Sequence, residues 1–338
     1  MLNTLIIGGA GYTGQELCKL VARHPQLRLT QVFGSPGGQH TGEALPLGCG
    51  QGVIEDGQLD AILSAAWKAH VILLATPHQA SSELVPLLMA QSQALIVDLS
   101  GAFRLPADLY PLHYGFAHQA PELLDSAVYG LVGWNDAAIR ESRLIAAPGC
   151  YPTAALLGLK PLARAGLIQG LPIINAVSGV SGAGRKATAG NAFCEVSLKP
   201  YGVLGHRHQP EIDQHLGQST LFTPHLGAFE RGILATMAVP VTGGLAQEQA
   251  SEVFEAAYGG HASILLSGDL KQQTPSVKAV AHSPYAQLGW ALDPDKQLLL
   301  VVSAIDNLLK GAASQALECI NIHFDFQLTP VPGPAWEA

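Results

Sequence analysis

Short apolar runs and helical patterns alternate along the first 150 residues of the chain. The apolar runs predict buried strands at residues 4–8, 27–34, 70–76, 94–100 and 144–147. Between them, apolar side chains recur at helical spacing over residues 13–23 and 82–91 and predict two helices. Continuously apolar strands separated by helices are typical of a parallel sheet that is covered on both faces. This half of the chain therefore predicts an α/β fold.

The pattern changes after residue 150. Longer β-rich runs predict strands at residues 173–178, 233–241 and 298–305, and helices are expected at 151–165, 247–258 and 308–319. This mixture indicates an α+β arrangement with a mixed or antiparallel sheet. We therefore expect one domain over residues 1–149 and a second over residues 150–306.

Composition narrows the class of protein. A chain of 338 residues, 48% of them hydrophobic, is long enough for two domains with sizeable cores. The net charge is −8 and there is no basic run, which argues against nucleic acid and membrane surfaces as partners. No apolar run approaches the ~18 residues of a membrane span, and the N-terminus lacks the marks of a signal peptide. The five cysteines are odd in number and form no C-x-x-C pair, so we expect no disulfide framework, no metal site and a cytoplasmic protein.

A glycine-rich turn follows the first predicted strand and opens the first predicted helix. Its sequence, GAGYTG at residues 9–14, fits the pattern G-x-G-x-x-G of Rossmann-type dinucleotide-binding domains. The glycines allow a tight turn and close approach to a pyrophosphate, and the helix N-terminus offers free N–H groups. A flavin, another nucleotide or a vacant fold remain alternatives. The candidate cofactor-binding residues of this turn are Gly9, Gly11, Tyr12, Thr13 and Gly14.

The end of the second predicted strand bears on the choice between NAD and NADP. NAD-binding domains usually place an acidic residue there to hold the ribose hydroxyls. Here the segment reads GSPGG at residues 34–38, so no acid repels a 2′-phosphate, and Ser35 can donate a hydrogen bond to one. NADP(H) is therefore the favoured cofactor, although no arginine follows.

The segment APGCYPT, residues 147–153, places Cys150 between a strand and a helix. A cysteine at a helix N-terminus is stabilised as the thiolate, which is the nucleophilic form. The strand–turn–helix setting near the expected domain boundary favours a catalytic Cys150 over a structural one. Cys18 and Cys319 lie on apolar helical faces and are interpreted as structural, as are Cys49 and Cys194.

The segment GHRHQPE, residues 205–211, offers an acid or base to accompany the cysteine. Histidine commonly exchanges protons with a thiol or with a carbonyl oxygen that becomes an alkoxide. In an extended chain His206 and His208 point one way and Arg207 the other. A metal site formed by the two histidines is an alternative, but no third ligand is evident.

Cationic groups for an anionic substrate are expected at two places. Arg104 follows a buried strand at its carboxyl end, where ligands of open α/β sheets bind, and it can hold a phosphate through two parallel hydrogen bonds. The loop SGVSGAGRK, residues 178–186, resembles an anion-binding nest of backbone N–H groups. A solvated surface arginine and a flexible connector are the alternatives. The candidate substrate-binding residues are Arg104, Ser181, Arg185, Lys186 and Arg207.

The chain resembles the N-acetyl-gamma-glutamyl-phosphate reductase family, which is related to aspartate-semialdehyde dehydrogenase. The resemblance covers nearly the whole length and rests on six segments: GGAGYTGQEL from Gly8, DLSGAFR from Asp98, APGCYPTA from Ala147, SGVSGAGRK from Ser178, PYGVLGHRHQPEI from Pro200 and DNLLKGAA from Asp306. It implies a Rossmann-type domain, completed by a C-terminal helix within residues 307–338, and a glyceraldehyde-3-phosphate-dehydrogenase-like α+β substrate domain. Relatives are commonly dimers or tetramers, so a homo-oligomer is expected.

The resemblance also implies roles for individual residues. The family's nucleophile aligns with Cys150 and its catalytic histidine with His206, with His208 as a weaker candidate. Asn307 is expected near the nicotinamide, and Ser178 and Gly179 join the candidate cofactor-binding residues.

The implied reaction reduces a small acyl phosphate to an aldehyde through a thioester on Cys150, with NADPH as reductant. Three alternatives remain open. The first is aspartate-semialdehyde dehydrogenase, against which the HRHQPEI segment argues. The second is a non-catalytic NADP-binding sensor. The third is a thiol hydrolase, which the dinucleotide-binding turn disfavours.

Overall fold

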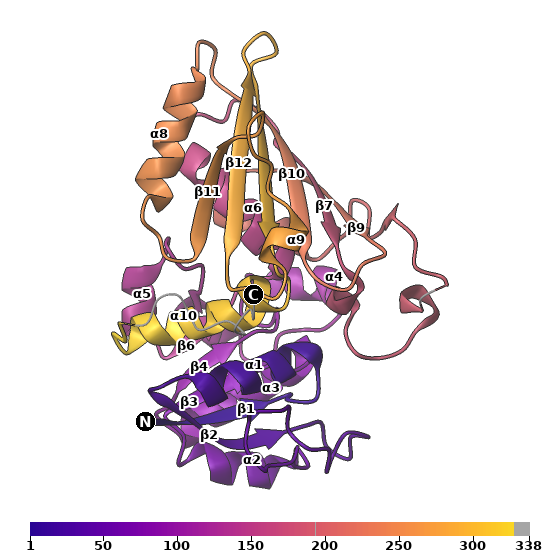
Figure 1. Cartoon of the computed structure of the whole chain (residues 1–338). Coiled ribbons are helices and arrows are strands. Elements are labelled where there is room, and N and C mark those ends of the chain that lie inside the picture. The colour runs from indigo at the N-terminus through magenta and orange to yellow at the C-terminus, as the bar shows by residue number, and fades with distance from the viewer. Residues whose placement is uncertain (193, 328–338) are drawn as a thin grey trace. The chain divides into compact units, whose positions relative to one another are not determined.

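The structure, a computed structural model, describes residues 1–192 and 194–327 (Figure 1). It consists of two compact units, one formed by Met1–Gly149 with the chain from Ala312 on, the other by Cys150–Gly311. The expected C-terminal helical segment, 307–338, lies outside the described residues from position 328 on. Within the described part of the chain, no helix has the length and apolarity needed to cross a bilayer.

The first unit is built on a six-stranded, all-parallel sheet. The sequence predicted the parallel sheet and five of these strands but not the two-residue strand Val128–Tyr129. Its strand order is β2-β1-β3-β4-β6-β5, and the strands are β1 (Leu2–Ile7), β2 (Leu27–Phe33), β3 (Val71–Leu74), β4 (Leu95–Asp98), β5 (Val128–Tyr129) and β6 (Leu144–Ala146). Because the chain runs from β1 first to β2 on one side and then to β3 on the other, the strand order reverses beside β1. Ligands of open α/β sheets bind at the carboxyl ends of the strands at such a reversal.

Helices cover this sheet and complete its core. They are α1 (Tyr12–Arg23), α2 (Leu59–Ala66), α3 (His78–Gln91), the short α4 (Tyr110–His113), α5 (Asp136–Glu141) and α10 (Ser314–His323), with 3-10 turns at Ala107–Leu109 and Pro121–Ser126. The strands β3 and β4 are buried throughout, which explains their apolar sequences. The exception is Asp98 at the end of β4, whose buried carboxylate accepts hydrogen bonds from Ser81 and Ser100. The helix α3 begins at His78, four residues before the predicted start, because Pro77 caps a polar first turn that carries no apolar periodicity.

The second unit is built on a seven-stranded mixed sheet in the order β11-β12-β13-β10-β7-β9-β8. The strands are β7 (Ile173–Ser178), β8 (Lys199–Pro200), β9 (Leu221–Leu226), β10 (Ile233–Pro240), β11 (Ile264–Asp269), β12 (Ala286–Asp293) and β13 (Leu298–Ile305). The helices are α6 (Cys150–Arg164), α7 (His208–Leu216), α8 (Gln247–Tyr258) and the single turn α9 (Val277–Val280), with 3-10 turns at Val180–Ala183 and Ala189–Asn191 and a π-helical turn at Leu309–Ala313. The mixed sheet confirms the α+β arrangement expected from the sequence.

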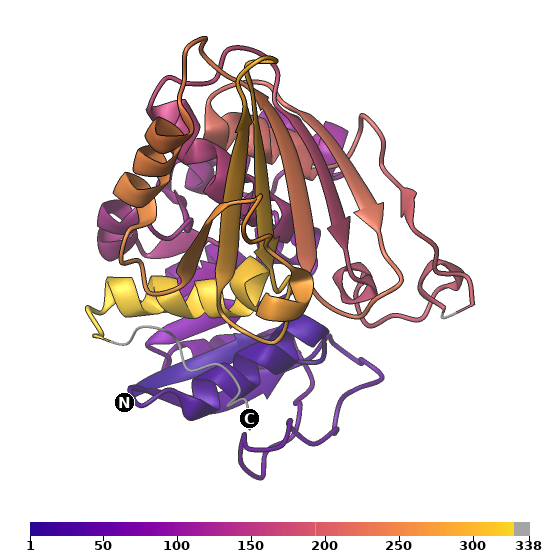
Figure 2. The same ribbon diagram turned by 45° about the horizontal axis from the view of Figure 1, so that its top comes forward.

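The two faces of this sheet differ. Alternate residues of β10 are buried, and α6 packs on that face against β10 and β13. The contact is close: a Cβ on Gly158 of α6 would lie 2.5 Å from Cε of Met237. Figure 2 shows the other face toward the viewer, with no long helix of the described chain drawn across it. Ile173 of β7 and Leu300 of β13 both pair with Ala238, so the three residues form one row across that face, and Ile173 and Leu300 are 41% and 38% exposed.

A buried histidine joins the end of α1 to α10. The His24 ring contacts Asn321 Oδ1 through Nε2 at 2.8 Å and accepts the Gln26 N–H at Nδ1, 3.2 Å away. These contacts define the neutral ring with its proton on Nε2. Burial lowers the pKa of His24 below its ordinary value.

We predict that protonation of His24 destabilises the first unit in mild acid. The folded protein resists the proton that the unfolded chain accepts, so stability falls as the pH drops through about 6.5, the ordinary histidine pKa. The measurement is the melting temperature at pH values between 7.5 and 5.5, with His24→Gln as the matched variant. The melting temperature of wild type should fall more over this range than that of His24→Gln. Equal slopes for the two proteins would contradict the assignment.

Candidate active site

The glycine-rich turn after β1 is shaped by close backbone contacts. Gly8 has a φ of +92°, and a Cβ there would lie 2.3 Å from the Ala75 carbonyl oxygen. A Cβ on Gly14 would lie 2.3 Å from the Gly8 carbonyl oxygen, and one on Gly9 would overlap a β2 side chain at 2.1 Å. Packing within the domain therefore requires glycine at positions 8, 9 and 14.

Gly11 is different. A Cβ at this position would have only the Gly8 carbonyl oxygen within 4 Å, at 3.8 Å, and its φ of −75° suits any residue. Gly11 caps α1, whose first turn carries no acidic side chain; Tyr12 is exposed there and Thr13 half-buried. The turn therefore leaves open space in front of a helix N-terminus, and the second glycine of such a turn serves the approach of a pyrophosphate.

A pocket of about 340 Å³ adjoins this end of the sheet. Residues that follow β2 and β3 line it, among them Ser35, Thr76 and Pro77, and Glu83 of α3 is the charged residue of its lining. This volume and mostly apolar lining suit a nucleoside-sized group. The turn and the pocket together fit a dinucleotide.

Arg104 is buried and its guanidinium is engaged with the backbone. Nε donates to the Ala147 carbonyl at 2.7 Å and Nη2 to the Leu99 carbonyl at 2.8 Å. The sequence suggested that Arg104 holds a phosphate through two parallel hydrogen bonds. The structure instead shows an arginine that ties the segment after β4 to the segment after β6.

In the second unit, Cys150 is the first residue of α6 and is partly exposed. The helix N-terminus places partial positive charge beside its sulfur, which favours the thiolate. A Cβ on Gly311 would lie 2.8 Å from Cβ of Cys150, so glycine at 311 is needed for the chain to pass this close.

Two tyrosines accompany the cysteine. The Tyr201 hydroxyl donates to the Tyr151 hydroxyl at 3.2 Å, which in turn donates to the His225 carbonyl at 3.0 Å. Burial raises the pKa of both phenols, and negative charge on Cys150 adds to the increase in each. Both tyrosines are therefore neutral hydrogen-bonding groups.

The two histidines pack together, although not in the way the sequence suggested. Their ring centroids are 4.9 Å apart, and the His206 ring also lies 5.8 Å from that of Tyr151. The expected extended geometry is wrong: Arg207 is helical and His208 opens α7. The turn lets the His208 N–H donate to His206 Nδ1 at 3.2 Å.

Burial, assisted by the charge of Arg207, lowers the pKa of His206 to about 4. The ring is therefore neutral at physiological pH. Because Nδ1 accepts the backbone N–H, the proton of the neutral ring is on Nε2. His206 thus presents a neutral N–H donor.

The loop after β7 folds back onto the chain that leads into β10. The N–H groups of Gly179, Val180 and Ser181 donate to the carbonyls of Gly232, Phe229 and Glu230. They are thus engaged, which differs from the anion nest expected from the sequence. The same loop brings Ser181 to Asn307, whose Nδ2 donates to Ser181 Oγ at 3.0 Å.

The cationic candidates of this unit lie further along the chain. Lys186 and Arg207 are exposed and Arg185 is half-buried. Sequence analysis missed Tyr151, Tyr201, Gly311 and the buried carboxylates of Glu211 and Asp306. The sequence could have pointed to Glu211, because it follows His208 by three residues and so lies on the same helix face.

Comparison with known families defines the class. Residues 3–142 match the NAD-binding domain of semialdehyde dehydrogenases, and residues 150–307 match their dimerisation domain. The chain therefore has the two domains of a semialdehyde dehydrogenase.

Curated relatives define the family more closely. N-acetyl-gamma-glutamyl-phosphate reductase of Aeromonas salmonicida is 49% identical, over 96% of this chain and 98% of its own length. The enzyme of that name from Vibrio vulnificus is 48% identical over the same shares. The chain belongs to the N-acetyl-gamma-glutamyl-phosphate reductase family, which confirms the resemblance seen in the sequence.

Solved structures of more distant proteins share the fold. Aspartate semialdehyde dehydrogenase II of Vibrio cholerae, complexed with ASA, matches with a TM-score of 0.73 at 16% identity and covers 97% of this chain and 99% of its own. A probable aspartate-semialdehyde dehydrogenase from Pseudomonas aeruginosa matches with a TM-score of 0.71 at 18% identity and the same coverage. At these identities the likeness concerns the fold alone.

We predict that Gly11→Ala weakens dinucleotide binding without destabilising the domain. The added methyl group meets the Gly8 carbonyl oxygen at an unstrained 3.8 Å and occupies the space in front of α1. Titration of NADPH fluorescence and thermal unfolding are the measurements. The matched control is Gly14→Ala, which should lower the melting temperature because its methyl group overlaps backbone. Undiminished NADPH affinity in Gly11→Ala would rule out this turn as the pyrophosphate site.

Proposed function

We propose that the protein reduces N-acetyl-L-glutamyl 5-phosphate to N-acetyl-L-glutamate 5-semialdehyde and phosphate, the third step of arginine biosynthesis. The observation that carries this proposal is the near full-length identity of 48–49% to enzymes named N-acetyl-gamma-glutamyl-phosphate reductase. The chemistry agrees with it, because Cys150 begins a helix whose second residue, Tyr151, packs against the ring of a neutral histidine donor.

In this proposal one domain binds the dinucleotide and the other binds the substrate. Residues 1–149, completed by the C-terminal helical segment within 307–338, hold the dinucleotide through the turn around Gly11, and residues 150–306 carry the substrate. NADP is favoured over NAD because no acid ends β2, and Ser35 in the adjoining pocket can donate to a 2′-phosphate. Ser178, Gly179 and Asn307 contribute from the second domain. When bound, the reduced cofactor supplies the hydride for the reduction.

Cys150 is the nucleophile in this mechanism. The N-terminus of α6 stabilises its thiolate, which attacks the acyl carbon. A carbon–sulfur bond forms as the bond between the acyl carbon and the phosphate oxygen breaks, and phosphate leaves. The resulting thioester divides one difficult displacement into two easier steps.

His206 acts on the oxygen at the acyl carbon. Its neutral Nε2–H can donate a hydrogen bond to that oxygen as negative charge develops there, and the ring keeps its proton. When the carbon–oxygen double bond re-forms, the carbon–sulfur bond breaks, and the aldehyde separates from the Cys150 thiolate. A neutral donor avoids the desolvation of an imidazolium in a buried site. His208 supports this role through its backbone N–H.

Substrate anions would meet cations of the second domain. Lys186 and Arg207 are exposed, and the half-buried Arg185 directly precedes Lys186. Arg104 is assigned a supporting role because two of its guanidinium nitrogens hold backbone carbonyls. Ser181, fixed by Asn307, can add a neutral hydrogen bond.

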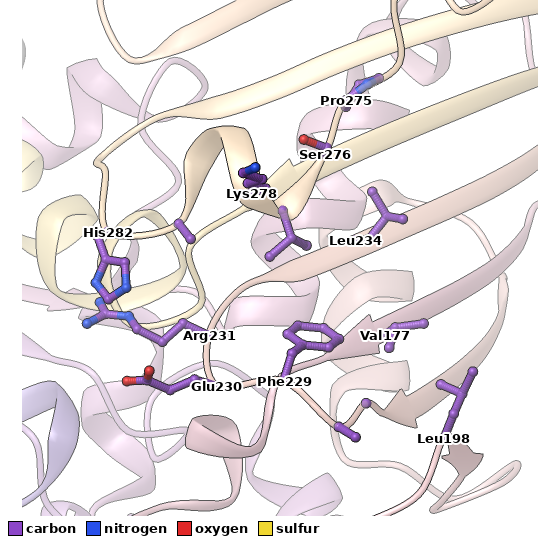
Figure 3. A pocket seen from close by; sticks show the side chains of 14 residues that line it. Val177, Leu198, Phe229, Glu230, Arg231, Leu234, Pro275, Ser276, Lys278 and His282 are labelled. Carbon is purple, nitrogen blue, oxygen red and sulfur yellow. The ribbon is translucent and has the colours of Figure 1, made fainter. Parts of the chain in front are cut away.

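The match to a dimerisation domain indicates a homo-oligomer. We place its dimer interface on the face of the second sheet that carries the row Ile173, Ala238 and Leu300. A pocket of about 680 Å³ opens on the same face, because Leu234 lines it and Leu234 alternates with the buried residues of β10 (Figure 3). Exposed apolar surface of this kind marks contact sites between proteins.

A cytoplasmic location fits the cysteines. All five are free thiols in the structure, as expected where thiols are kept reduced.

The reaction run in reverse tests the proposed activity. Purified protein with N-acetylglutamate semialdehyde and NADP⁺ should form NADPH continuously only when phosphate is present. Without phosphate the thioester stays on Cys150, and NADPH formation stops after a single turnover. Cys150→Ser should abolish this absorbance change and leave NADPH binding intact. NADPH formation with aspartate semialdehyde but not with N-acetylglutamate semialdehyde would indicate an aspartate-semialdehyde dehydrogenase. If the folded protein binds NADP but forms NADPH with neither substrate, it would instead be a non-catalytic NADP-binding sensor.

We predict that Leu300→Glu separates the dimer. The substitution puts a charge at the β13 end of the apolar row and is compatible with an exposed position on that strand. Light scattering after size exclusion should give the 35.3 kDa monomer for this variant and a multiple of that mass for wild type. Leu112→Glu, at a 76% exposed position of the first unit, is the control and should keep the wild-type mass. An unchanged mass for Leu300→Glu would move the interface elsewhere.

A further inference from the structure

The carboxylate of Asp306, directly after β13, is fully buried and accepts five hydrogen bonds. Arg231 donates to it from Nε and from Nη2, each at 3.0 Å. The backbone N–H groups of His282, Leu308 and Leu309 donate at 2.6, 2.9 and 2.9 Å. A buried carboxylate is tolerated only when it is paired and hydrogen-bonded, and the two parallel bonds from Arg231 meet that requirement.

This ion pair fixes the chain on both sides of a candidate site residue. Arg231 is followed by Gly232, whose N–H donates to Asn307 Oδ1 at 2.6 Å. Asn307 follows Asp306 and donates in turn to Ser181 Oγ. The amide of Asn307 is therefore held between two segments that the Arg231–Asp306 pair joins.

The same residue controls the chain that passes Cys150. The bonds from Leu308 and Leu309 to the Asp306 carboxylate begin the π-helical turn Leu309–Ala313, and the Gly311 N–H donates to the Asp306 carbonyl at 2.9 Å. Gly311 is the residue that packs against Cys150. The position of the backbone beside the thiol thus depends on Asp306.

His282 supplies a further sign of constraint. Its φ of +63° lies in the left-handed region, which is uncommon for a residue other than glycine. Its N–H donates to Asp306, and Figure 3 shows its side chain beside that of Arg231. Such conformations persist where the surroundings impose them.

We infer that Asp306 and Arg231 are positioning residues for the reductase site: they hold the Asn307 amide against Ser181 and Gly311 against Cys150. Neither is assigned contact with the reacting atoms. The inference rests on the proposed function for its kinetic test, but not for its tests of thiol reactivity and dinucleotide binding.

The test compares Arg231→Lys and Asp306→Asn with wild type. Arg231→Lys keeps the charge but loses the paired donors, and Asp306→Asn keeps the size but loses the charge. Asp293→Asn is the matched control, because Asp293 forms an exposed ion pair with Lys296 at the end of β12. Each protein is assayed well below its own melting temperature.

Four quantities are measured: the melting temperature, the rate of Cys150 alkylation by iodoacetamide, NADPH affinity and the steady-state constants. We expect kcat to fall about 100-fold in Arg231→Lys with a smaller change in KM, since a displacement of about 1 Å has that effect on a catalytic group. NADPH affinity should fall about tenfold through the loosened Asn307 amide, and alkylation should become faster as Gly311 moves away from the thiol.

A lower melting temperature with unchanged kcat, NADPH affinity and alkylation rate would overturn the inference and leave a purely structural ion pair. Should Asp306→Asn fail to fold, Arg231→Lys decides. If wild type shows no reductase activity, the proposed function fails separately, and alkylation and NADPH binding still decide whether the pair positions Asn307 and Gly311.

Discussion

The candidate catalytic domain depends on the register of its central strand. Ile233, the first residue of β10, pairs with Ser178 at the end of β7 on one side and with Ile305 at the end of β13 on the other. That register brings three sequence-distant segments to one edge of the sheet: the loop after 178, the approach 229–232 and the segment after 305. A slip by one residue would turn every β10 side chain to the opposite face. The contact between Ser181 and Asn307 is a consequence of this pairing rather than of either segment alone.

Burial sets the chemistry at that edge as much as charge does. His206 is a neutral donor because the aromatic rings around it exclude water and Arg207 adds positive charge, while the turn into α7 fixes its tautomer. At Cys150 the charged form is favoured instead, because the N-terminus of α6 stabilises the thiolate. A thiolate nucleophile and a neutral N–H donor together suit attack on an acyl carbon whose oxygen gains negative charge.

Much of this was readable in the sequence, and the omissions have physical causes. The strand 298–305 was predicted with its observed bounds because Ser303 alone interrupts its apolar run. The position of Cys150 at a helix start was predicted because a helix start is a local feature. The strand β12 was missed because glycine and glutamine interrupt its pattern. Asp306 and Tyr151 were missed because their partners lie more than 70 residues away. The geometry of 206–208 was predicted wrongly because an extended chain was assumed where Arg207 starts a helix.

An acidic chain with few cations can still bind an anion if some arginines stabilise the fold and other cationic side chains remain exposed to the substrate. Arg104 and Arg231 are buried, and each holds the backbone or a carboxylate with fixed donors. Both side chains therefore stabilise the fold. Because the Asp306 carboxylate neutralises the charge of Arg231, that arginine exerts little attraction on an anionic substrate. The exposed Lys186 and Arg207 remain able to respond to a bound phosphate or carboxylate. Because the net charge is −8, attraction of an anionic substrate must come from such local groups rather than from the field of the whole molecule.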